Sequence, residues 1–520
     1  MTDDGTTLLR ELAEDPWGEV SPSVYDTGRL VSLAPWLPGH AARLDYLGRA
    51  QRSDGGWGEP DGYALVPTLS ATEALIACLR RGSAPHLVEP ARRGLAALHA
   101  WLEPFSAAVP DTIAVEVVLP CLVAAINTHL DAEPDAHWAV PFRLPLPRGF
   151  HAGAARALRA KVEFSGPEPQ TWWASLEALG SGPFGRVRPV NGAVACSPAA
   201  TAAWLDGAAP FGSGPAAAAY SFLNRLQARY GGPVPGVTPI TVFERAWVLA
   251  GIEGTAPPFV LDGLAGALGP GGAPAAAGLP PDCDDGAVAL TALRRHGWDR
   301  SPECLLDYHT GAYFTCFPGE RTASTSTNAH AVEALYGHLA AHPADRPRYL
   351  PPAAAAVGWL LDVQDADGCW WDKWHASPYY ATACAVAVLA GPPVDRAVRW
   401  VLATQRADGS WGRWGGTVEE TAYAVLVLAR ARAIDVRPAL AAGVAYLRGN
   451  DGSGEQRGLW HAKDLYAPGR VIRAARLGAL NAAAAASGPA GAGAAWPPPA
   501  PRSAPDRRAP AGTGAAATRG

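Results

Sequence analysis

Three carboxylic acids lie within four residues at Asp282-Cys283-Asp284-Asp285. Two prolines precede them and an apolar run, residues 287–290, follows, which is the pattern of a helix start. Neighbouring carboxyl groups cannot all ionise cheaply in a poorly solvated pocket, so one of them is expected to keep its proton. Such a group is a candidate strong Brønsted acid, able to protonate a substrate as weakly basic as an unactivated alkene.

An ordinary helix cap explains the same four residues. Asp is common at the N-cap, acids are favoured in the first turn, and Gly297 suits the position after the helix C-terminus. The positive end of the helix dipole also lowers carboxyl pKa values, which opposes the protonated state that an acid catalyst needs. The acid hypothesis therefore requires burial, like-charge repulsion and a hydrogen bond from a neighbouring group.

Length and composition restrict the class of protein. The 520 residues predict two domains, and the 48% apolar content supplies material for their cores. A net charge of −5 without a Lys/Arg stripe argues against a nucleic-acid partner. No apolar run approaches the roughly 18 residues of a membrane span and the N-terminus is acidic, so we expect a soluble, cytoplasmic protein without stable membrane insertion. Eight cysteines without CxxC pairs predict buried thiols rather than disulfides or zinc ligands.

A Q-x-x-D-G-x-W motif occurs three times, beginning at Gln51, Gln364 and Gln405 and ending at Trp57, Trp370 and Trp411. The last two copies start 41 residues apart, which is the length of a helical hairpin. A Gln at the end of one helix, an Asp-Gly turn and a Trp packed on the Gln would staple a corner between two antiparallel helices. The repeat therefore predicts stacked helical hairpins.

The remaining sequence is Ala-, Leu- and Val-rich, with Gly/Pro clusters between the runs and no strand-like alternation. Helices are predicted at residues 72–80, 112–128, 198–205, 216–229, 241–251 and 327–340. These patterns predict an all-α protein made of two α/α barrels. From residue 487 the chain becomes Ala/Gly/Pro/Arg-rich, which predicts a disordered tail over 487–520.

The two motifs together resemble those of the class II terpene cyclases, the protonation-initiated enzymes that include squalene–hopene cyclase and the copalyl diphosphate synthases. Further segments that match the bacterial diterpene branch, spread over residues 40–475, are Val115-Glu116-Val117-Val118-Leu119-Pro120, Ser175-Leu176-Glu177-Ala178-Leu179, Phe314-Thr315-Cys316-Phe317-Pro318-Gly319-Glu320, Asp372-Lys373-Trp374 and Trp460-His461-Ala462-Lys463-Asp464-Leu465-Tyr466. The resemblance implies a βγ architecture with the active site between the barrels. Residues 1–26 would form the first helix of the β domain, 27–235 an inserted γ barrel and 236–486 the rest of the β domain.

The resemblance also assigns roles to the acids. Asp284 would donate the proton, with Asp282 and Asp285 as its like-charge neighbours. Asn328 falls where the family places a hydrogen-bonding partner of the donor. Without the resemblance, Asn328 is equally well explained as a helix N-cap.

The implied reaction is protonation of the terminal alkene of a prenyl diphosphate, ring closure and deprotonation, with the diphosphate retained. We expect geranylgeranyl diphosphate as substrate, with farnesyl diphosphate (a drimenyl-type synthase) as the alternative. The class I ionisation signature D-D-x-x-D is absent, so a separate class I synthase or tailoring enzyme would consume the product. Prenyl length and product stereochemistry do not follow from the sequence.

Family positions suggest groups for the two ends of the substrate. Lys463 would hold the diphosphate, and Asp111 with Glu116 would hold Mg²⁺ beside it, since hard oxygen ligands suit that ion. On residue type alone, all three are better explained as a surface lysine, a helix cap and a solvated face. Further candidates are Arg156 and Lys161, with Arg159, for the phosphates and Trp172, Trp173, Trp370 and Tyr379 as aromatic rings facing the cation, although core packing explains such rings equally well.

Two positions depart from the pattern of ent-copalyl diphosphate synthases. Those enzymes carry a His before the S-L-E-G segment and an Asn in G-V-P-N, which position a water as the terminal base, whereas this chain has Ala174 and Gly236. The identity of the base is therefore open. We expect a different labdane isomer or a rearranged clerodane skeleton as product.

Four other classes compete with this interpretation. A squalene–hopene-like triterpene cyclase would be longer, with more corner motifs and an apolar membrane-docking surface. A zinc prenyltransferase subunit would need an Asp-Cys-His ligand set. An inverting glycosidase needs two carboxylates far enough apart to hold a water, which the adjacent Asp284 and Asp285 do not provide. A helical scaffold without activity would tolerate Asp284→Asn unchanged.

Overall fold

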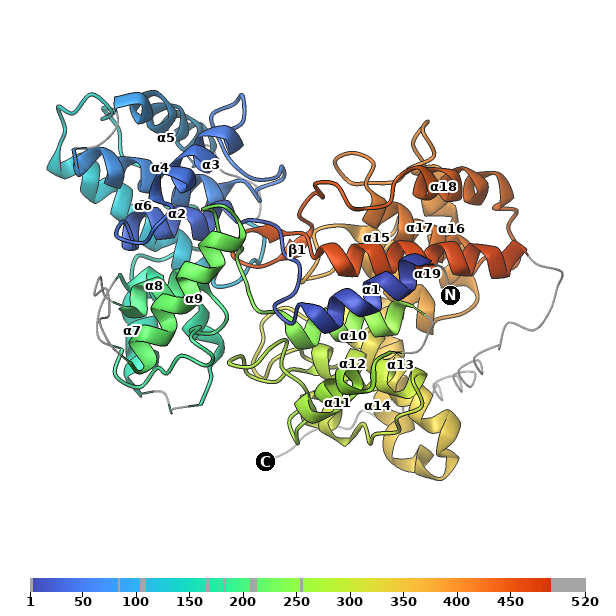
Figure 1. The fold of residues 1–520 in the computed structure, drawn as a ribbon. Coiled ribbons are helices and arrows are strands. Elements are labelled where there is room, and N and C mark those ends of the chain that lie inside the picture. The colour runs from blue at the N-terminus through green and yellow to red at the C-terminus, as the bar shows by residue number, and fades with distance from the viewer. Residues whose placement is uncertain are drawn as a thin grey trace, which may run out of the picture.

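The computed structural model describes residues 3–82, 85–102, 109–164, 166, 168–180, 184–205, 213–252 and 256–487. Over these residues the protein is helical, apart from isolated bridges and one antiparallel hairpin of β1 (Trp460–His461) and β2 (Leu465–Tyr466). Two lobes stand side by side with β1 between them (Figure 1). The all-α prediction is confirmed, whereas the tail predicted for 487–520 falls, beyond residue 487, outside the described residues.

The C-terminal lobe, formed by α1 and residues 240–487, is a closed double ring of helices. Each inner helix contacts the next and the last contacts the first, in the order α10, α12, α13, α15, α17, α19. The inner helices are α10 (Thr241–Gly251), α12 (Cys283–Arg295), α13 (Thr325–Ala341), α15 (Pro378–Val388), α17 (Val418–Leu428) and α19 (Gly469–Ser487). Around them lie α1 (Asp3–Glu14), α11 (Pro258–Ala267), α14 (Arg346–Asp362), α16 (Pro392–Ala403) and α18 (Arg437–Gly449), with short 3₁₀ turns η3 (Glu303–Tyr308) and η4 (Pro343–Asp345).

The N-terminal lobe, residues 24–234, repeats this design. Its inner ring closes in the order α2, α4, α6, η2, α8. These elements are α2 (Val24–Leu33), α4 (Leu65–Arg80), α6 (Val115–Ala132), the 3₁₀ segment η2 (Thr171–Leu179) and α8 (Pro198–Leu205). The outer elements are α3 (His40–Ala50), η1 (Pro85–Leu87), α5 (Val88–Leu102), α7 (Ala154–Phe164) and α9 (Pro215–Arg229).

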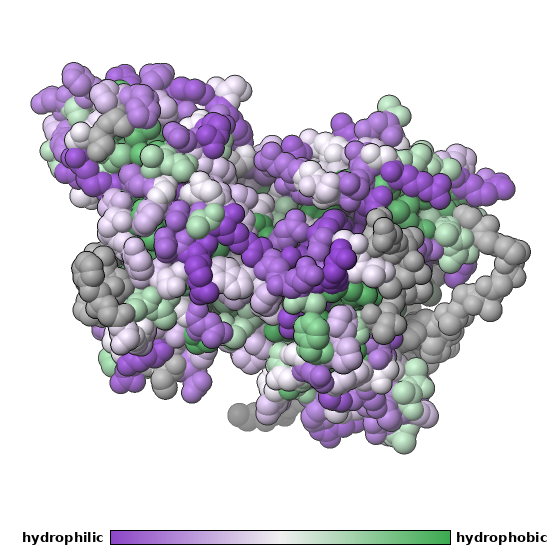
Figure 2. All heavy atoms as spheres, viewed as in Figure 1, coloured by the Kyte–Doolittle hydropathy of each residue, from purple (hydrophilic) through white to green (hydrophobic). Residues whose placement is uncertain are grey.

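Burial patterns explain which helices are inner and which are outer. The inner helix α17 buries every residue from Val418 to Val425, so it is surrounded on all sides. The outer helix α16 buries only Val394, Ala397, Val398 and Val401, the i, i+3, i+4, i+7 stripe of an amphipathic helix. In Figure 2, hydrophilic and intermediate residues cover most of the coloured surface, with smaller hydrophobic areas between them.

The hydrophobic clusters respect the two lobes. One set draws on residues 8–20 and 240–483, so α1 packs into the C-terminal lobe although it begins the chain. The other set draws on residues 25–234. The domain limits 1–26, 27–235 and 236–486 stay a prediction.

The repeated motif forms the corners predicted for it. In each copy the Gln side chain donates from Nε2 to two backbone carbonyls, one in its own turn and one at the start of the following outer helix. The Trp indole donates to a carbonyl ten residues back, as Trp411 does to Val401 at 2.7 Å. Its backbone N–H donates to a Thr hydroxyl on the next inner helix. Each corner therefore ties three helices.

The expectation that no segment is long and apolar enough to span a membrane is wrong for α6. Val115–Ala132 passes that test by length and composition. It belongs to the inner ring of the N-terminal lobe, and 44% of it is buried. One such helix is weak evidence for a membrane span, because core helices pass the same test.

The closed rings determine where functional side chains meet. In the C-terminal lobe the acidic motif, the segment before His330, and Glu419 all lie at the N-terminal ends of inner helices. In the N-terminal lobe Asp111 precedes α6 and Ser197 precedes α8. Contacts between these two sets of helix starts, described below, bring them together between the lobes.

Candidate active site

The acidic motif is both a helix cap and a buried cluster of carboxyl groups. Asp282 is the N-cap of α12, and its Oδ1 accepts the backbone N–H of Asp285 at 2.8 Å. The side chains nevertheless lie inside the protein, because Asp282, Asp284 and Asp285 are only 4%, 7% and 6% exposed. The cap explanation is therefore correct for Asp282, and it leaves the buried carboxyl groups of the other two to be explained.

Burial outweighs the helix dipole at two of these acids. Burial raises the pKa of Asp282 above its usual range. Burial, together with the charge of Asp282 and a side-chain hydrogen bond to it, raises the pKa of Asp285 further. The pair therefore retains a proton at a pH where exposed carboxyl groups have lost theirs.

Asp284 is paired with a histidine that the sequence did not single out. Nδ1 of His330, on the first half of α13, lies 2.7 Å from Oδ1 of Asp284. The carboxylate raises the pKa of His330 well above its usual range, although burial, the largest influence, opposes this. Nε2 of the ring contacts Sγ of Cys384 at 3.5 Å. A buried cation thus stands beside the carboxyl group that the family resemblance names as the donor.

The expected hydrogen bond between Asn328 and Asp284 is wrong. Oδ1 of Asn328 accepts the N–H of Phe314 at 2.8 Å, and its Nδ2 donates to the carbonyls of Phe314 and Ser324. These three bonds use both amide hydrogens and the amide oxygen. Asn328 instead fixes the segment at Phe314, which runs on to Cys316, whose carbonyl accepts the N–H of Cys283 on α12.

Aromatic rings line the neighbourhood of the acid. The His330 ring meets Trp247 edge to face at 5.6 Å and Tyr380 at 6.3 Å. Trp460 lies 4.8 Å from Tyr380, and Phe243 packs between Trp247 and Trp460. Ring faces grouped in this way stabilise a cation in a site without water. We call these four rings the aromatic wall.

The sequence selected different aromatic residues, and two of those choices are wrong. Trp370 is fully buried in a corner, where its indole donates to the carbonyl of Leu360. The ring of Tyr379 lies 4.6 Å from that of Trp400 on the outer helix α16, while its neighbour Tyr380 joins the wall. The first turn of α15 directs adjacent residues to different sides, and sequence alone does not tell which side faces the acid.

Four further candidates lie in the N-terminal lobe. Trp173 is buried in the core beneath α7, and Trp172 packs at its edge. The ammonium of Lys161 lies 5.5 Å from the Trp172 ring centre, and Arg156 and Lys161 are exposed on α7. Leu279, three residues before Asp282, packs against the same cluster as Trp173. The roles predicted for these four residues stay predictions.

The predicted acidic pair meets two cations from the other lobe. Arg321 lies 3.3 Å from Asp111 and 3.6 Å from Glu116, so these two acids do come together. Nζ of Lys373 lies 2.7 Å from Glu320 and 3.7 Å from Asp111. Oδ2 of Asp111 is buried without a hydrogen bond. This charged cluster, whose five members are named here, joins the start of α6 to the segments before α13 and α15.

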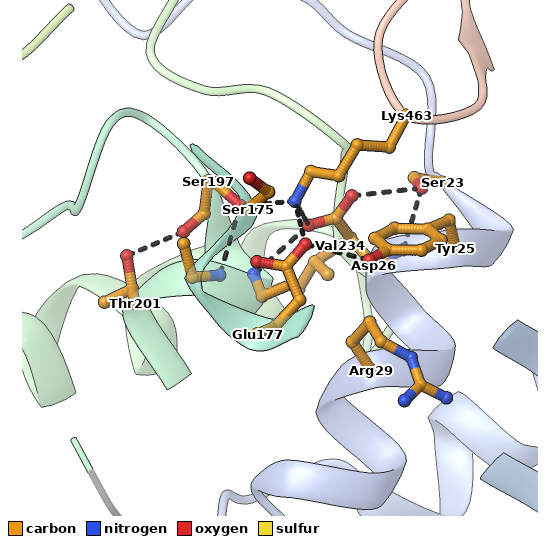
Figure 3. A network of polar contacts seen from close by, with 12 residues as sticks. Ser23, Tyr25, Asp26, Arg29, Ser175, Glu177, Ser197, Thr201, Val234 and Lys463 are labelled. Atoms are coloured by element: carbon orange, nitrogen blue, oxygen red, sulfur yellow. Dashed lines mark hydrogen bonds and ion pairs between the residues drawn. The ribbon is translucent and has the colours of Figure 1, made fainter. Parts of the chain in front are cut away.

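Lys463 occupies a buried network rather than an open anion site. It is 3% exposed, and its Nζ lies 2.6 Å from Glu177, 2.8 Å from Ser197 and 3.6 Å from Asp26 (Figure 3). The hydroxyl of Tyr25 also donates to Glu177. The charge of Lys463 therefore has partners within the protein, and its role in binding diphosphate stays a prediction. The lysine extends from the β1–β2 hairpin into the N-terminal lobe and links the two.

The same network lies beside one of the two departures from the family pattern. Asp464, next to Lys463, accepts the hydroxyl of Ser23. A Cβ atom at Gly236 would lie 3.4 Å from Oδ2 of Asp26 and 3.5 Å from Oδ1 of Asp464. Burial raises the pKa of Asp26 to about 7, although Lys463 opposes this. An asparagine at 236 would therefore extend into a polar, buried environment.

Comparison with known proteins supports this description. Residues 324–471 match the model of the squalene-hopene cyclase C-terminal domain. The chain is 46% identical to the ent-copalyl diphosphate synthase of Streptomyces sp. KO-3988, over 91% of this chain and 94% of the relative. It is 39% identical to the labda-7,13-dienyl diphosphate synthase of Streptomyces clavuligerus, over 91% of both. The solved ent-copalyl diphosphate synthase of Streptomyces platensis superposes with a TM-score of 0.86 at 48% identity, covering 92% and 99% of the two chains.

These similarities extend through both lobes of the chain. The two closed rings correspond to the βγ fold implied by the sequence. The chain belongs to the class II diterpene cyclases, isomerases that begin cyclisation by protonation, and within them to the bacterial relatives of copalyl diphosphate synthase.

Proposed function

We propose that the enzyme protonates the terminal alkene of geranylgeranyl diphosphate and closes two rings, yielding a labdane-type or clerodane-type diphosphate. The observation that carries the proposal is the set of three buried carboxyl groups, one paired with His330, beside the aromatic wall. The names of the relatives, copalyl and labdadienyl diphosphate synthases, support the diterpene chain length. The product keeps its diphosphate, so a second enzyme that ionises or hydrolyses it would follow.

Asp284, in its protonated form beside the protonated His330, is the proton donor in this mechanism. Oδ1 is engaged by His330, so the proton leaves from Oδ2 and forms a C–H bond with the alkene π electrons. A tertiary carbocation results, and the charge of His330 stabilises the carboxylate left behind. Asp282 and Asp285 hold a proton close by, and the ring faces of the wall stabilise the cation as it moves.

The diphosphate is held at the charged cluster. Arg321 and Lys373 supply cationic groups for phosphate oxygens, and Asp111 with Glu116 supplies hard oxygen ligands for Mg²⁺. The buried, unbonded Oδ2 of Asp111 suits such a ligand. Bound Mg²⁺ would neutralise diphosphate charge, while the chain's own residues orient the head group and direct the polyene toward the acid.

Incubation of the purified protein with geranylgeranyl or farnesyl diphosphate tests the proposal. After dephosphorylation, mass spectrometry and NMR of the alcohol identify the product. We expect a bicyclic diterpene alcohol from the wild type and a loss of at least 1,000-fold, roughly what removal of a general acid costs, with Asp284→Asn. If the enzyme converts only farnesyl diphosphate, the proposed substrate changes from geranylgeranyl to farnesyl diphosphate. Undiminished cyclisation by Asp284→Asn would overturn the mechanism.

A further inference from the structure

A buried carboxylate inside the aromatic wall has no function in the acid step. Glu419, in the first turn of α17, is 1% exposed. Its Oε1 accepts the indole N–H of Trp460 at 2.7 Å and lies 3.3 Å from Nε2 of His375 and 3.4 Å from the hydroxyl of Tyr423. Its Oε2 is buried without a hydrogen-bond partner. An unsolvated carboxylate oxygen is costly, and such costs are tolerated where they serve function.

The histidine beside it is held by the backbone of Ser377. Nδ1 of His375 lies 3.1 Å from the N–H of Ser377 and 3.3 Å from its carbonyl oxygen. When Nδ1 accepts the N–H, the ring carries its proton on Nε2. Nε2 faces Oε1 of Glu419, so the imidazole donates to the carboxylate. His375 is itself fully buried and packs against Trp460 and Tyr380. The pair thus forms a dyad with one free carboxylate oxygen.

The dyad is linked to the acid through Tyr380 and to the charged cluster through the backbone. On one side, Tyr380 contacts both His375, at 4.7 Å between ring centres, and the His330 ring that pairs with Asp284. On the other side, the backbone leads from His375 to Lys373 of the cluster in two residues. A polyene protonated at its far end carries its positive charge toward the diphosphate as rings close. The final proton must therefore be lost between these two ends.

We propose that Glu419 is the terminal proton acceptor, with His375 as its positioning residue. This inference rests on the proposed function. A C–H bond next to the cationic carbon breaks, its electron pair becomes the new C=C bond, and the proton passes to Oε2 of Glu419. Asp284 has lost one proton and Glu419 has gained one, so the reaction is balanced as an isomerisation. The dyad supplies the base that Ala174 and Gly236 do not.

Glu419→Gln tests the inference, because the amide keeps Oε1 for Trp460 and Tyr423 and removes the basic oxygen. We expect substrate consumption within about tenfold of wild type, since the acid step is intact. We expect the wild-type alkene to fall below half of the products, replaced by hydroxylated or hydride-shifted skeletons. Tyr423→Phe is the matched control: it removes one bond to Oε1 and should leave the product profile unchanged.

The outcomes separate the two proposals. If the wild type converts no prenyl diphosphate, the proposed function fails. If the wild type and Asp284→Asn behave as expected but Glu419→Gln yields the wild-type mixture, only this inference is overturned. Should Glu419→Gln lack a cooperative melting transition, His375→Gln replaces it, and an unchanged product mixture from that folded variant overturns the inference equally.

Discussion

Nδ1 of His330 and Oδ1 of Asp284 lie 2.7 Å apart between two inner helices of one ring, with Trp247 and Tyr380 against the imidazole. The contact gives the buried carboxyl group of Asp284 a cationic neighbour. A cation stabilises the carboxylate that remains after proton transfer, so it strengthens the acid at the moment of reaction.

Replacing this histidine should slow the acid step. We expect His330→Gln to lower kcat roughly 10- to 100-fold with a small change in KM, because the amide keeps a hydrogen bond and removes the charge. The pKa of His330 is higher in the folded protein than in the unfolded chain. Its charge, and the stability that this charge contributes, is therefore complete at a pH below the unfolded-state pKa and is lost as the pH rises through the folded-state pKa. The wild-type rate should therefore fall on the alkaline side, and the variant should lack that limb. Cys384→Ala, which removes only the contact to Nε2, should behave as wild type.

Asp26 should make stability depend on pH. Its carboxyl group has a pKa of about 7 in the folded protein, so between its usual value and 7 the folded state binds a proton that the unfolded chain does not. Stability from this group is therefore lost as pH rises from about 4 to 7, by about 4 kcal/mol at most.

Thermal melting across that range measures the effect. Asp26→Asn should show a flatter dependence of melting temperature on pH than the wild type. Asp45→Asn, a change at an exposed acid of α3, should follow the wild-type curve. If the melting temperatures of wild type and Asp26→Asn depend on pH in the same way, Asp26 does not have the raised pKa on which the prediction rests.

The acidic pair of the charged cluster should control the response to Mg²⁺. We expect Asp111→Asn and Glu116→Gln to raise KM for the prenyl diphosphate and the Mg²⁺ concentration at half-maximal rate, each by roughly tenfold, because an oxygen ligand is weakened. Asp131→Asn lies on the same helix α6, where its partner is Arg143 at the far end, and should change neither value. If Asp111→Asn and Glu116→Gln show the same Mg²⁺ dependence as the control Asp131→Asn, the proposed metal site is contradicted.

Restoring the two polar groups missing from the family pattern should redirect the product. A side chain at 236 has room, since its Cβ would make ordinary contacts with Asp26, Ala462 and Asp464. We expect Ala174→His with Gly236→Asn to shift the products toward the ent-copalyl type, because a positioned water would then compete for the final proton. Gly236→Ala fills the same space without a polar group and should not. An identical product profile from the double variant would count against the importance of these positions.

Periodic and repeated features of the sequence were sufficient for the fold. The runs at 198–205 and 241–251 coincide with α8 and α10, and the three Gln/Trp motifs form the predicted corners. Such features depend on local spacing and on burial of apolar side chains, which sequence displays directly.

The site was predicted less completely, because its members are set by contacts between distant segments. The acids of α12 were identifiable from their density, but Asn328 and His330, two residues apart on one helix, differ only in which side of α13 they occupy. The partners of Lys463, Glu177 and Asp26, come from the other lobe, and sequence spacing does not reveal them. Arg321 and Glu419 had no distinguishing neighbour in the sequence.

The double ring also bears on how such enzymes diversify. The proposed proton donor Asp284 and the proposed acceptor Glu419 lie in the opening turns of two inner helices, α12 and α17, while the helix bodies and the corner motifs hold the barrel together. A substitution in one opening turn can alter the position at which the carbocation loses its proton without disturbing the packing that keeps the enzyme folded. New carbon skeletons are therefore accessible by single exchanges at these turns, a short evolutionary step from one product to another.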